Sequence, residues 1–285
     1  MRKNKLLALG LAALMAASVA GCSTPSASVD DTKAAESGSD SSQSAAAGEK
    51  IFRYSNTADI ATIDPDKTNS VADATVSYHI YDGLYRNVQG ELQPATAESY
   101  EVSDDGLVYT FKLRQDTKWS DGQTVTAKDY EYGMKRLCDP AAACPASYLG
   151  AVLKNGAKVS EGELPVDELG VKALDDFTLE ITLENPADYF VSMTSMSAFM
   201  PVREDLVEKY GNEFGGSADK QVYNGPFVVS EYSNGKVELT KNPDYYDNEK
   251  ISLDGVEILT VADQTTAVSM FDAGELDLAE VPTEL

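Results

Sequence analysis

The chain has 285 residues, with 47 acidic against 23 basic side chains, a formal net charge of −24 and a single histidine. This length allows two domains of ordinary size, and the acidic balance argues against a nucleic-acid binder, whose phosphate contacts need a surface rich in lysine and arginine. With only His79 available, histidine-cluster metal sites are also disfavoured, and a Ser-His-Asp triad has a single candidate base.

The N-terminus has the pattern of a lipoprotein signal peptide, which we assign to residues 1–21. Three basic residues precede an apolar run at 6–20 that is too short to cross a bilayer. The run ends in VAGC, which resembles the bacterial lipobox, and the resemblance implies that Cys22 carries a diacylglycerol. An ordinary signal peptide that happens to end in cysteine is the alternative.

Residues 22–48 are predicted to form a disordered tether behind the acylated cysteine. Val29 is the only branched aliphatic residue between positions 23 and 48, and no aromatic residue occurs there. Such a segment cannot bury enough apolar surface to offset the entropy lost on ordering. We therefore expect the folded part to begin near Glu49.

The first half of the folded part alternates short strands and capped helices. A strand is predicted at 51–54, and Ser70 with Asp73 fits a capping box for a helix that Gly83 would end. A strand at 107–113 has alternating apolar residues. A second helix is predicted to begin at Thr126 and to end before Pro140.

The second half is predicted to contain two hairpins and a βαβ unit. One hairpin spans 171–183, and the other turns at Asn234-Gly235. A strand at 256–261, a helix at 265–273 and a strand at 275–279 would form the βαβ unit, which requires a parallel pair. The fold class is therefore α/β, with an antiparallel region inserted between about 85 and 200.

Motifs for chemistry are weak in this sequence, and we predict no cofactor and no metal. There is no GxxxxGK[ST] loop for nucleotide phosphates, and the acidic turn at 244–249 lacks EF-hand spacing. Two carboxylates could form a glycosidase pair, but no pattern selects them. Cys138 and Cys144 form a C-x5-C pair that in an exported protein is either a disulfide or two free thiols.

The stretch at 109–136, YTFKLRQDTKWSDGQTVTAKDYEYGMKR, resembles the signature region of the peptide/nickel class of ABC-transporter solute-binding proteins, and within it the oligopeptide-binding members. The resemblance extends from about Phe52 to Leu285. Further matches follow in the order of the family: ATIDPDK at 61–67, RLCDP at 136–140, ASYL at 146–149, LGVKALDDFTLEITLENP at 169–186, YNGPF at 223–227, NPDYYDN at 242–248 and AGELDL at 273–278.

The resemblance implies a multi-lobe fold like that of the type II periplasmic binding proteins, with a mixed sheet and an inserted antiparallel α+β lobe. Residues 49–82 and 205–285 would form a first, ligand-gripping lobe, which is incomplete, and residues 83–204 the inserted second lobe. Family members are much longer, so the resemblance covers roughly the N-terminal half of their fold and implies truncation at the C-terminus.

The function implied by the resemblance is binding without catalysis. Such a protein would bind oligopeptides in extended form between lobes and deliver them to an ABC permease with its ATPase subunits. We expect a monomer held to the cell membrane by a lipid anchor, at the cell surface or in the periplasm. The alternatives are an exported lipoprotein hydrolase of glycosidase type, or the same fold with a dipeptide, nickel, haem or sugar ligand.

The resemblance also carries over candidate ligand-binding residues. Asn69, Ser70 and Val71 match family positions whose main chain pairs with the peptide, although the oligopeptide-binding members have an acidic residue at the position of Asn69. The segment 223–225 is a second candidate. A pocket tyrosine of the family is missing before ASYL, and Tyr148 approaches its place without being its equivalent. The candidates are thus Asn69, Ser70, Val71, Tyr148, Tyr223, Asn224 and Gly225.

Overall fold

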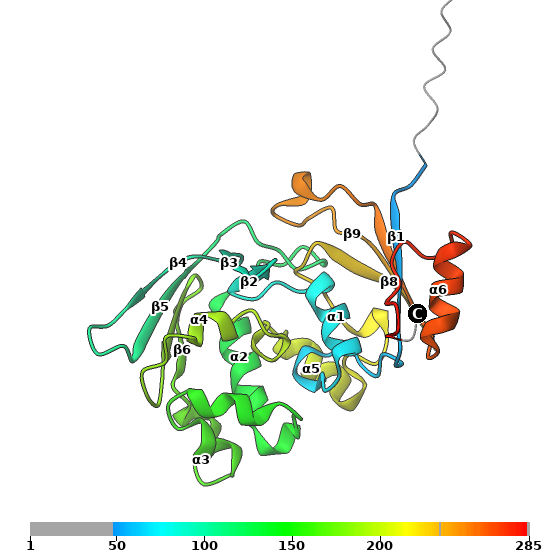
Figure 1. The fold of residues 1–285 in the computed structure, drawn as a ribbon. Helices are drawn as coiled ribbons and strands as arrows, with labels where there is room; N and C mark the ends of the chain where they lie inside the picture. The colour runs from blue at the N-terminus through cyan, green and yellow to red at the C-terminus, as the bar shows by residue number, and fades with distance from the viewer. Residues whose placement is uncertain (1–47, 234, 284–285) are drawn as a thin grey trace, which may run out of the picture. The chain divides into compact units, whose positions relative to one another are not determined.

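A computed structural model describes residues 48–233 and 235–283 (Figure 1). Its first sheet has four strands in the order β1-β10-β9-β8, and the pairs are antiparallel except that β1 and β10 run parallel. Gly235 has φ of +82° at the turn of the β8–β9 hairpin, a conformation that glycine adopts without steric cost. The strands are β1 (Ile51–Asn56), β8 (Phe227–Ser233), β9 (Lys236–Lys241) and β10 (Gly255–Thr260).

The parallel pair forms differently from the predicted βαβ unit. β10 leads into helix α6 (Gln264–Asp272), as expected, but the segment at 275–279 is not a strand. It makes one isolated parallel bridge, between Leu278 and Tyr54, and Asp277 N donates to Arg53 O. The parallel neighbour of β10 is instead β1, which comes from the opposite end of the folded part. Figure 1 shows α6 beside β1.

The second sheet has the order β4-β5-β7-β6 and is antiparallel throughout, as predicted for the inserted region. On β5, Tyr109, Phe111 and Leu113 are buried, and the ring of Phe190 packs edge-on against the first two. A separate hairpin pairs β2 with β3. The strands are β2 (Tyr85–Val88), β3 (Glu91–Pro94), β4 (Ala97–Val102), β5 (Val108–Leu113), β6 (Val171–Asp175) and β7 (Thr178–Thr182).

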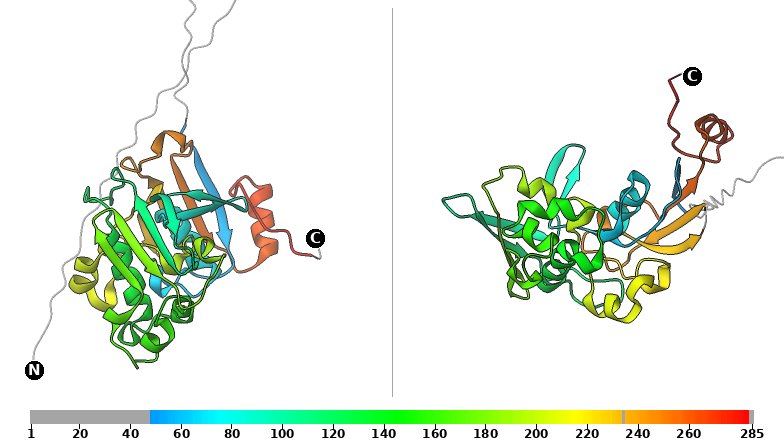
Figure 2. Two further views of the ribbon diagram at one scale, coloured as in Figure 1. Left: turned by 90° about the vertical axis from the view of Figure 1, so that its left-hand side faces the viewer. Right: turned by 90° about the horizontal axis from the view of Figure 1, so that it is seen from below.

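Two capped helices appear where the sequence predicts them. In α2 the Asp129 carboxylate accepts from Thr126 N at 2.7 Å, as a capping box requires, and the helix packs on β6 and β7 (Figure 2). In α1 the Ser70 hydroxyl accepts from Asp73 N at 3.0 Å, and the helix ends before Gly83. The helices are α1 (Val71–Ile80), α2 (Ala127–Cys138), α3 (Gly156–Ser160), α4 (Phe190–Met193), α5 (Glu204–Tyr210) and α6.

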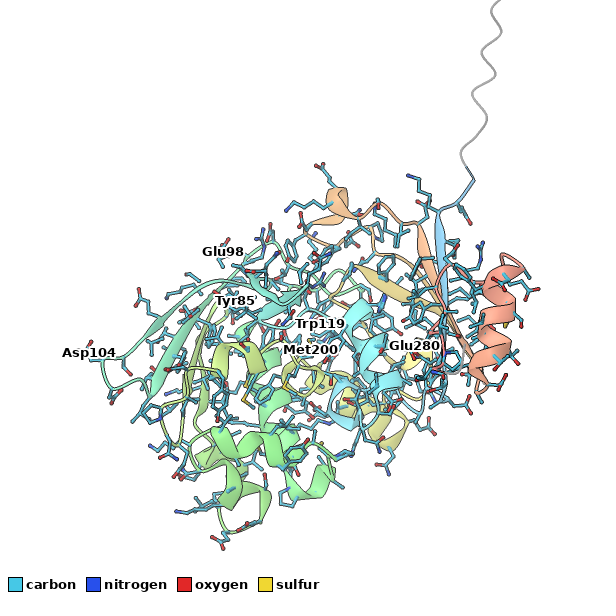
Figure 3. The ribbon with its side chains drawn as sticks, viewed as in Figure 1. Tyr85, Glu98, Asp104, Trp119, Met200 and Glu280 are labelled. Atoms are coloured by element: carbon cyan, nitrogen blue, oxygen red, sulfur yellow. The ribbon has the colours of Figure 1, made fainter. Side chains whose placement is uncertain are left out.

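The KWSDG turn, at residues 118–122, contacts both helix α2 and the segment that precedes β8. Trp119, labelled in Figure 3, is 1% exposed, and its Nε1 donates to Asp129 at 3.4 Å. The next residue, Ser120, donates its N–H to Tyr223 O at 2.8 Å, and its hydroxyl accepts from Tyr223 N at 3.1 Å. This turn therefore holds the start of α2 to the segment that enters β8.

Candidate ligand-binding groove

An extended segment immediately before α1 presents unpaired backbone groups at the surface. Ser70 has φ of −129° and ψ of 159°, so its backbone has strand geometry. The Asn69 carbonyl and the Val71 N–H have no partner among the described residues. In an extended chain the C=O of one residue and the N–H of the residue two further on point to the same side. This segment can therefore pair with one residue of a parallel strand, which would donate to Asn69 and accept from Val71.

The segment is fixed by side chains on both of its flanks. The Asp73 carboxylate accepts from Ala61 N at 2.8 Å and from Asn69 N at 3.4 Å. On the other flank, the Thr68 and Ser197 hydroxyls are 2.9 Å apart. Because these contacts set the backbone before any ligand arrives, pairing would cost little additional ordering.

The segment lines an open groove of about 440 Å³ together with Tyr148. The structure thus brings four of the sequence-predicted residues to one place: Asn69, Ser70, Val71 and Tyr148. The Val71 side chain is 85% exposed and that of Tyr148 is 72% exposed, so neither is committed to the core.

Two further hollows share residues with this groove. One, of about 560 Å³, adjoins it through Tyr148, Leu149 and Met196 and extends to Met193 and Tyr189. The other, of about 370 Å³, adjoins it through Tyr78 and contains Tyr85 and Met200, both labelled in Figure 3. The volumes fall in the range of roughly 300–1,000 Å³ that small-ligand pockets occupy.

The segment 223–225 does not line the groove. Tyr223 is 3% exposed and its hydroxyl donates to Ala218 O, while the Asn224 side chain bonds both backbone groups of Asp82, at 3.1 and 3.0 Å. Gly225 passes so close to α1 that a Cβ would lie 2.5 Å from Ile80 C. These residues have structural partners already, and we leave them out of the proposed binding site.

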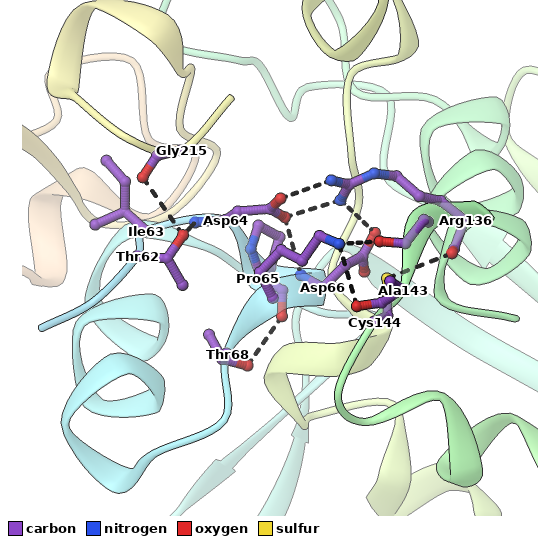
Figure 4. A network of polar contacts seen from close by, with 12 residues as sticks. Thr62, Ile63, Asp64, Pro65, Asp66, Thr68, Arg136, Ala143, Cys144 and Gly215 are labelled. Carbon is purple, nitrogen blue, oxygen red and sulfur yellow. Dashed lines mark hydrogen bonds and ion pairs between the residues drawn. The ribbon is translucent and has the colours of Figure 1, made fainter. Parts of the chain in front are cut away.

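A buried ion cluster holds the loop that leads into the groove (Figure 4). Arg136 of α2 bonds both oxygens of Asp64, at 2.8 and 2.6 Å, and one oxygen of Asp66 at 2.8 Å. Lys67 donates to the carbonyls of Ala142 and Ala143, the latter at 3.2 Å. The cluster ties the 64–67 loop to α2 and to the segment after it.

The two carboxylates of this cluster, Asp64 and Asp66, differ in their hydrogen bonding. Asp64 is held by two parallel bonds from the guanidinium, whereas Asp66 Oδ1 is buried without a hydrogen-bond partner. Burial raises the pKa of Asp66 from 3.8 to about 7, although the charge of Arg136 opposes the shift. Sequence reasoning found the matching stretches at 61–67 and 136–140 but missed the cluster. The sequence did contain a signal for the cluster: one family match holds two aspartates, Asp64 and Asp66, and another begins with Arg136.

The disulfide considered for the C-x5-C pair is not formed: Cys138 and Cys144 are buried free thiols. Burial raises the pKa of Cys138 to about 11 and that of Cys144 to about 12, so both stay protonated at neutral pH. The third cysteine, Cys22, lies outside the described residues, as do the predicted signal peptide and most of the tether.

The described part of the chain offers no metal centre and no membrane span. Within it, no group of three or more His, Cys, Asp and Glu side chains is placed to hold a metal ion. None of the helices in residues 48–233 and 235–283 has the length and apolar character needed to cross a bilayer.

The chain matches a known protein family over most of its length. Residues 91–285 match the family of bacterial extracellular solute-binding proteins, family 5, middle region. The chain is 38% identical over 242 residues to the probable deoxycholate-binding periplasmic protein YgiS of Escherichia coli, covering 84% of the chain and 45% of YgiS. It is 35% identical to the periplasmic oligopeptide-binding protein OppA of Salmonella typhimurium, covering 99% of the chain and 50% of OppA.

Solved structures give the same result. The structure of OppA of Listeria monocytogenes bound to peptide has a TM-score of 0.78 and 35% identity, covering 81% of the chain and 46% of that protein. A substrate-binding domain of an oligopeptide ABC transporter from Bacillus anthracis also has a TM-score of 0.78, with 37% identity over 81% of the chain and 45% of that protein. The chain spans about half the length of the relatives it matches, and the type II binding-protein fold expected from the sequence is confirmed.

Proposed function

We propose that this chain, which belongs to family 5 of the bacterial extracellular solute-binding proteins, binds oligopeptides in extended form for an ABC importer. The relatives named as oligopeptide-binding proteins and the peptide-bound OppA structure support this ligand class. One relative is named for deoxycholate, so family membership alone does not define the ligand.

The unpaired backbone at Asn69 and Val71 is the observation that favours a peptide. A strand edge recognises main-chain amides and carbonyls, which every peptide has and a steroid lacks. Open hollows beside this edge leave room for side chains of different sizes. Backbone pairing with roomy side-chain pockets is the combination expected of a protein that accepts many peptide sequences.

The proposal includes the organisation of the whole protein. Residues 49–82 and 205–285 would form the ligand-gripping lobe and residues 83–204 the inserted lobe, in line with the origin of the strands in the first and second sheets. Cys22 would anchor a monomer to the membrane outside the cytoplasm, where a permease and its ATPase subunits would be the partners. The names of the relatives favour binding over the glycosidase alternative.

Val71→Pro tests the pairing directly, because proline lacks the N–H that would donate to the peptide. Val71 is the first residue of α1, where proline is well tolerated, and Ser70 already has the extended backbone that precedes a proline. Val71→Ala is the matched control, since it shortens the same exposed side chain and keeps the N–H.

We expect Val71→Pro to weaken binding of a mixed oligopeptide library about tenfold, because an unpaired carbonyl on the ligand costs roughly 1–3 kcal/mol. The alanine variant keeps the N–H and loses only part of a groove side chain, so it should bind clearly more tightly than the proline variant. Both variants should unfold at the same denaturant concentration as the unmodified protein. Isothermal calorimetry measures the affinities. Equal affinity of the proline and alanine variants would refute strand pairing at this edge.

A further inference from the structure

Exposed apolar side chains gather along the groove. Among the described residues, twelve large hydrophobic side chains are exposed, and five of them line the groove or the hollows that adjoin it. These five are Val71, Tyr78, Tyr148, Tyr189 and Met196. Single exposed hydrophobic residues are common on any protein, but a contiguous group marks a surface that contacts a partner or ligand.

The 440 Å³ groove and the 560 Å³ hollow are almost free of charge, in a chain whose net charge is −24, whereas Asp82 and Arg86 line the 370 Å³ hollow. No lining residue of the 440 Å³ groove is ionisable except two tyrosines, Tyr78 and Tyr148. The adjoining 560 Å³ hollow adds one carboxylate, Glu184. A charged group entering the groove would lose its water and gain no counter-ion, which is unfavourable, whereas an apolar group would gain from the same transfer.

Two methionines line the groove or the 560 Å³ hollow. Met196 lines both, and Met193 lies in the hollow beside Tyr189. The methionine side chain is flexible and polarisable, so it adapts to apolar groups of different shapes. Selection here would therefore act on apolar character and less on the shape of the group.

We infer that the 440 Å³ groove and the 560 Å³ hollow, which together we call the apolar groove, select peptides with a large apolar side chain beside the residue that pairs with Asn69 and Val71. The inference rests on the proposed function and adds a substrate class to it: peptides with aromatic or long aliphatic residues at this position are preferred over those with lysine or glutamate there. The strand edge supplies binding to any peptide, and the apolar groove supplies the preference.

The test uses peptides of glycine and alanine that carry phenylalanine, lysine or glutamate at each position in turn. At one position the phenylalanine peptide should bind at least about tenfold more tightly than both charged peptides, the scale on which apolar pockets discriminate. A peptide with benzoylphenylalanine at that position should crosslink on illumination to Met193, Met196 or Tyr148. Crosslinks confined to other segments would overturn the assignment.

Met196→Glu should change the order of peptide affinities, an effect that loss of stability alone cannot produce. The new carboxylate should reverse the preference, so that the lysine peptide binds more tightly than the phenylalanine peptide. Leu174→Glu is the matched control, because Leu174 is also an exposed apolar residue, 48% exposed on β6, and lines none of these hollows. It should leave the order of affinities unchanged.

The outcomes separate the two proposals. Binding of all three peptide types with equal affinity at every position would overturn the apolar groove and leave peptide binding standing. If no peptide of any type binds, the proposed function fails and the inference fails with it. Retention of the phenylalanine preference in Met196→Glu would also overturn the groove as its source.

Discussion

Replacing Arg136 by methionine should destabilise the protein strongly and make its stability depend on pH. The substitution keeps an unbranched apolar stem of similar length and removes the guanidinium that bonds Asp64 and Asp66. Both carboxylates would then be buried without a cation from α2. Water has almost no access to these carboxylates, because the side chain of Asp64 is 2% exposed and that of Asp66 is 0% exposed.

The expected loss of unfolding free energy is about 3–5 kcal/mol above neutral pH, the usual cost of removing one partner from a buried ion pair. Burial already raises the pKa of Asp66 while Arg136 is present, so the ionised form is disfavoured even before the guanidinium is removed. The expected loss is a large part of the 5–15 kcal/mol that stabilises a typical domain.

The direction of the pH dependence follows from that raised pKa. The folded state holds the proton of Asp66 more tightly than the unfolded state does, so this group favours folding below about pH 4 and loses that contribution as pH rises to about 7. Without Arg136 the folded-state pKa should rise further. The difference between variant and unmodified protein should therefore be large near pH 8 and smaller near pH 5, where Asp66 is protonated in the folded variant.

Urea denaturation followed by circular dichroism at both pH values measures this difference. Arg53→Met is the matched control, because Arg53 forms an exposed ion pair with Asp277 at 3.7 Å and such pairs contribute at most about 1 kcal/mol. A loss in Arg136→Met no larger than that of the control, or a loss that is the same at both pH values, would refute the reasoning.

Three other predictions concern single positions. Cys22→Ser should abolish incorporation of a labelled fatty acid in cells, and label retained in the variant would contradict the lipid anchor. Cys138 and Cys144 should resist alkylation in the native protein near pH 8 and react after unfolding, because burial raises both thiol pKa values; peptide mapping by mass spectrometry reads out each site. Gly225→Ala should lower the free energy of unfolding in urea by about 1–3 kcal/mol, because its Cβ would lie 2.5 Å from Ile80 C, whereas Gly48→Ala, with open space around it, should have no effect. Equal stability of the two glycine variants would show that α1 and the 225 segment can separate at little cost.

Local patterns in the sequence were sufficient to predict many of the elements. Ser70 and Asp73, and Thr126 and Asp129, each lie within one helical turn, so their capping contacts can be read from spacing alone. The same holds for the hairpin of β6 and β7, whose alternating apolar residues face the core. The family resemblance named both Tyr148 and Asn69 as candidate ligand-binding residues, and they line the same groove. No local pattern in the sequence relates these two residues.

Contacts between distant residues could not be derived in this way. The segment at 275–279 has a good strand pattern, but its place beside β10 is taken by β1. The residues at 223–225 match a family motif, but the motif does not indicate that the side-chain amide of Asn224 is hydrogen-bonded to the backbone of Asp82. Nor does spacing indicate that Arg136 reaches Asp64, because the pairing depends on how α2 packs against a loop 72 residues earlier.

The pairing of β1 with β10 constrains the order in which the chain can fold. Lys50 and Asp254, which are hydrogen-bonded at the start of this pair, are 204 residues apart, so closing the first sheet requires nearly the whole folded part to be present. The second sheet is built from strands between residues 97 and 182, and it can nucleate while β1 is still unpaired. We expect the region of the second sheet to gain hydrogen-exchange protection first during refolding, and β1 to be the last strand of either four-stranded sheet to do so.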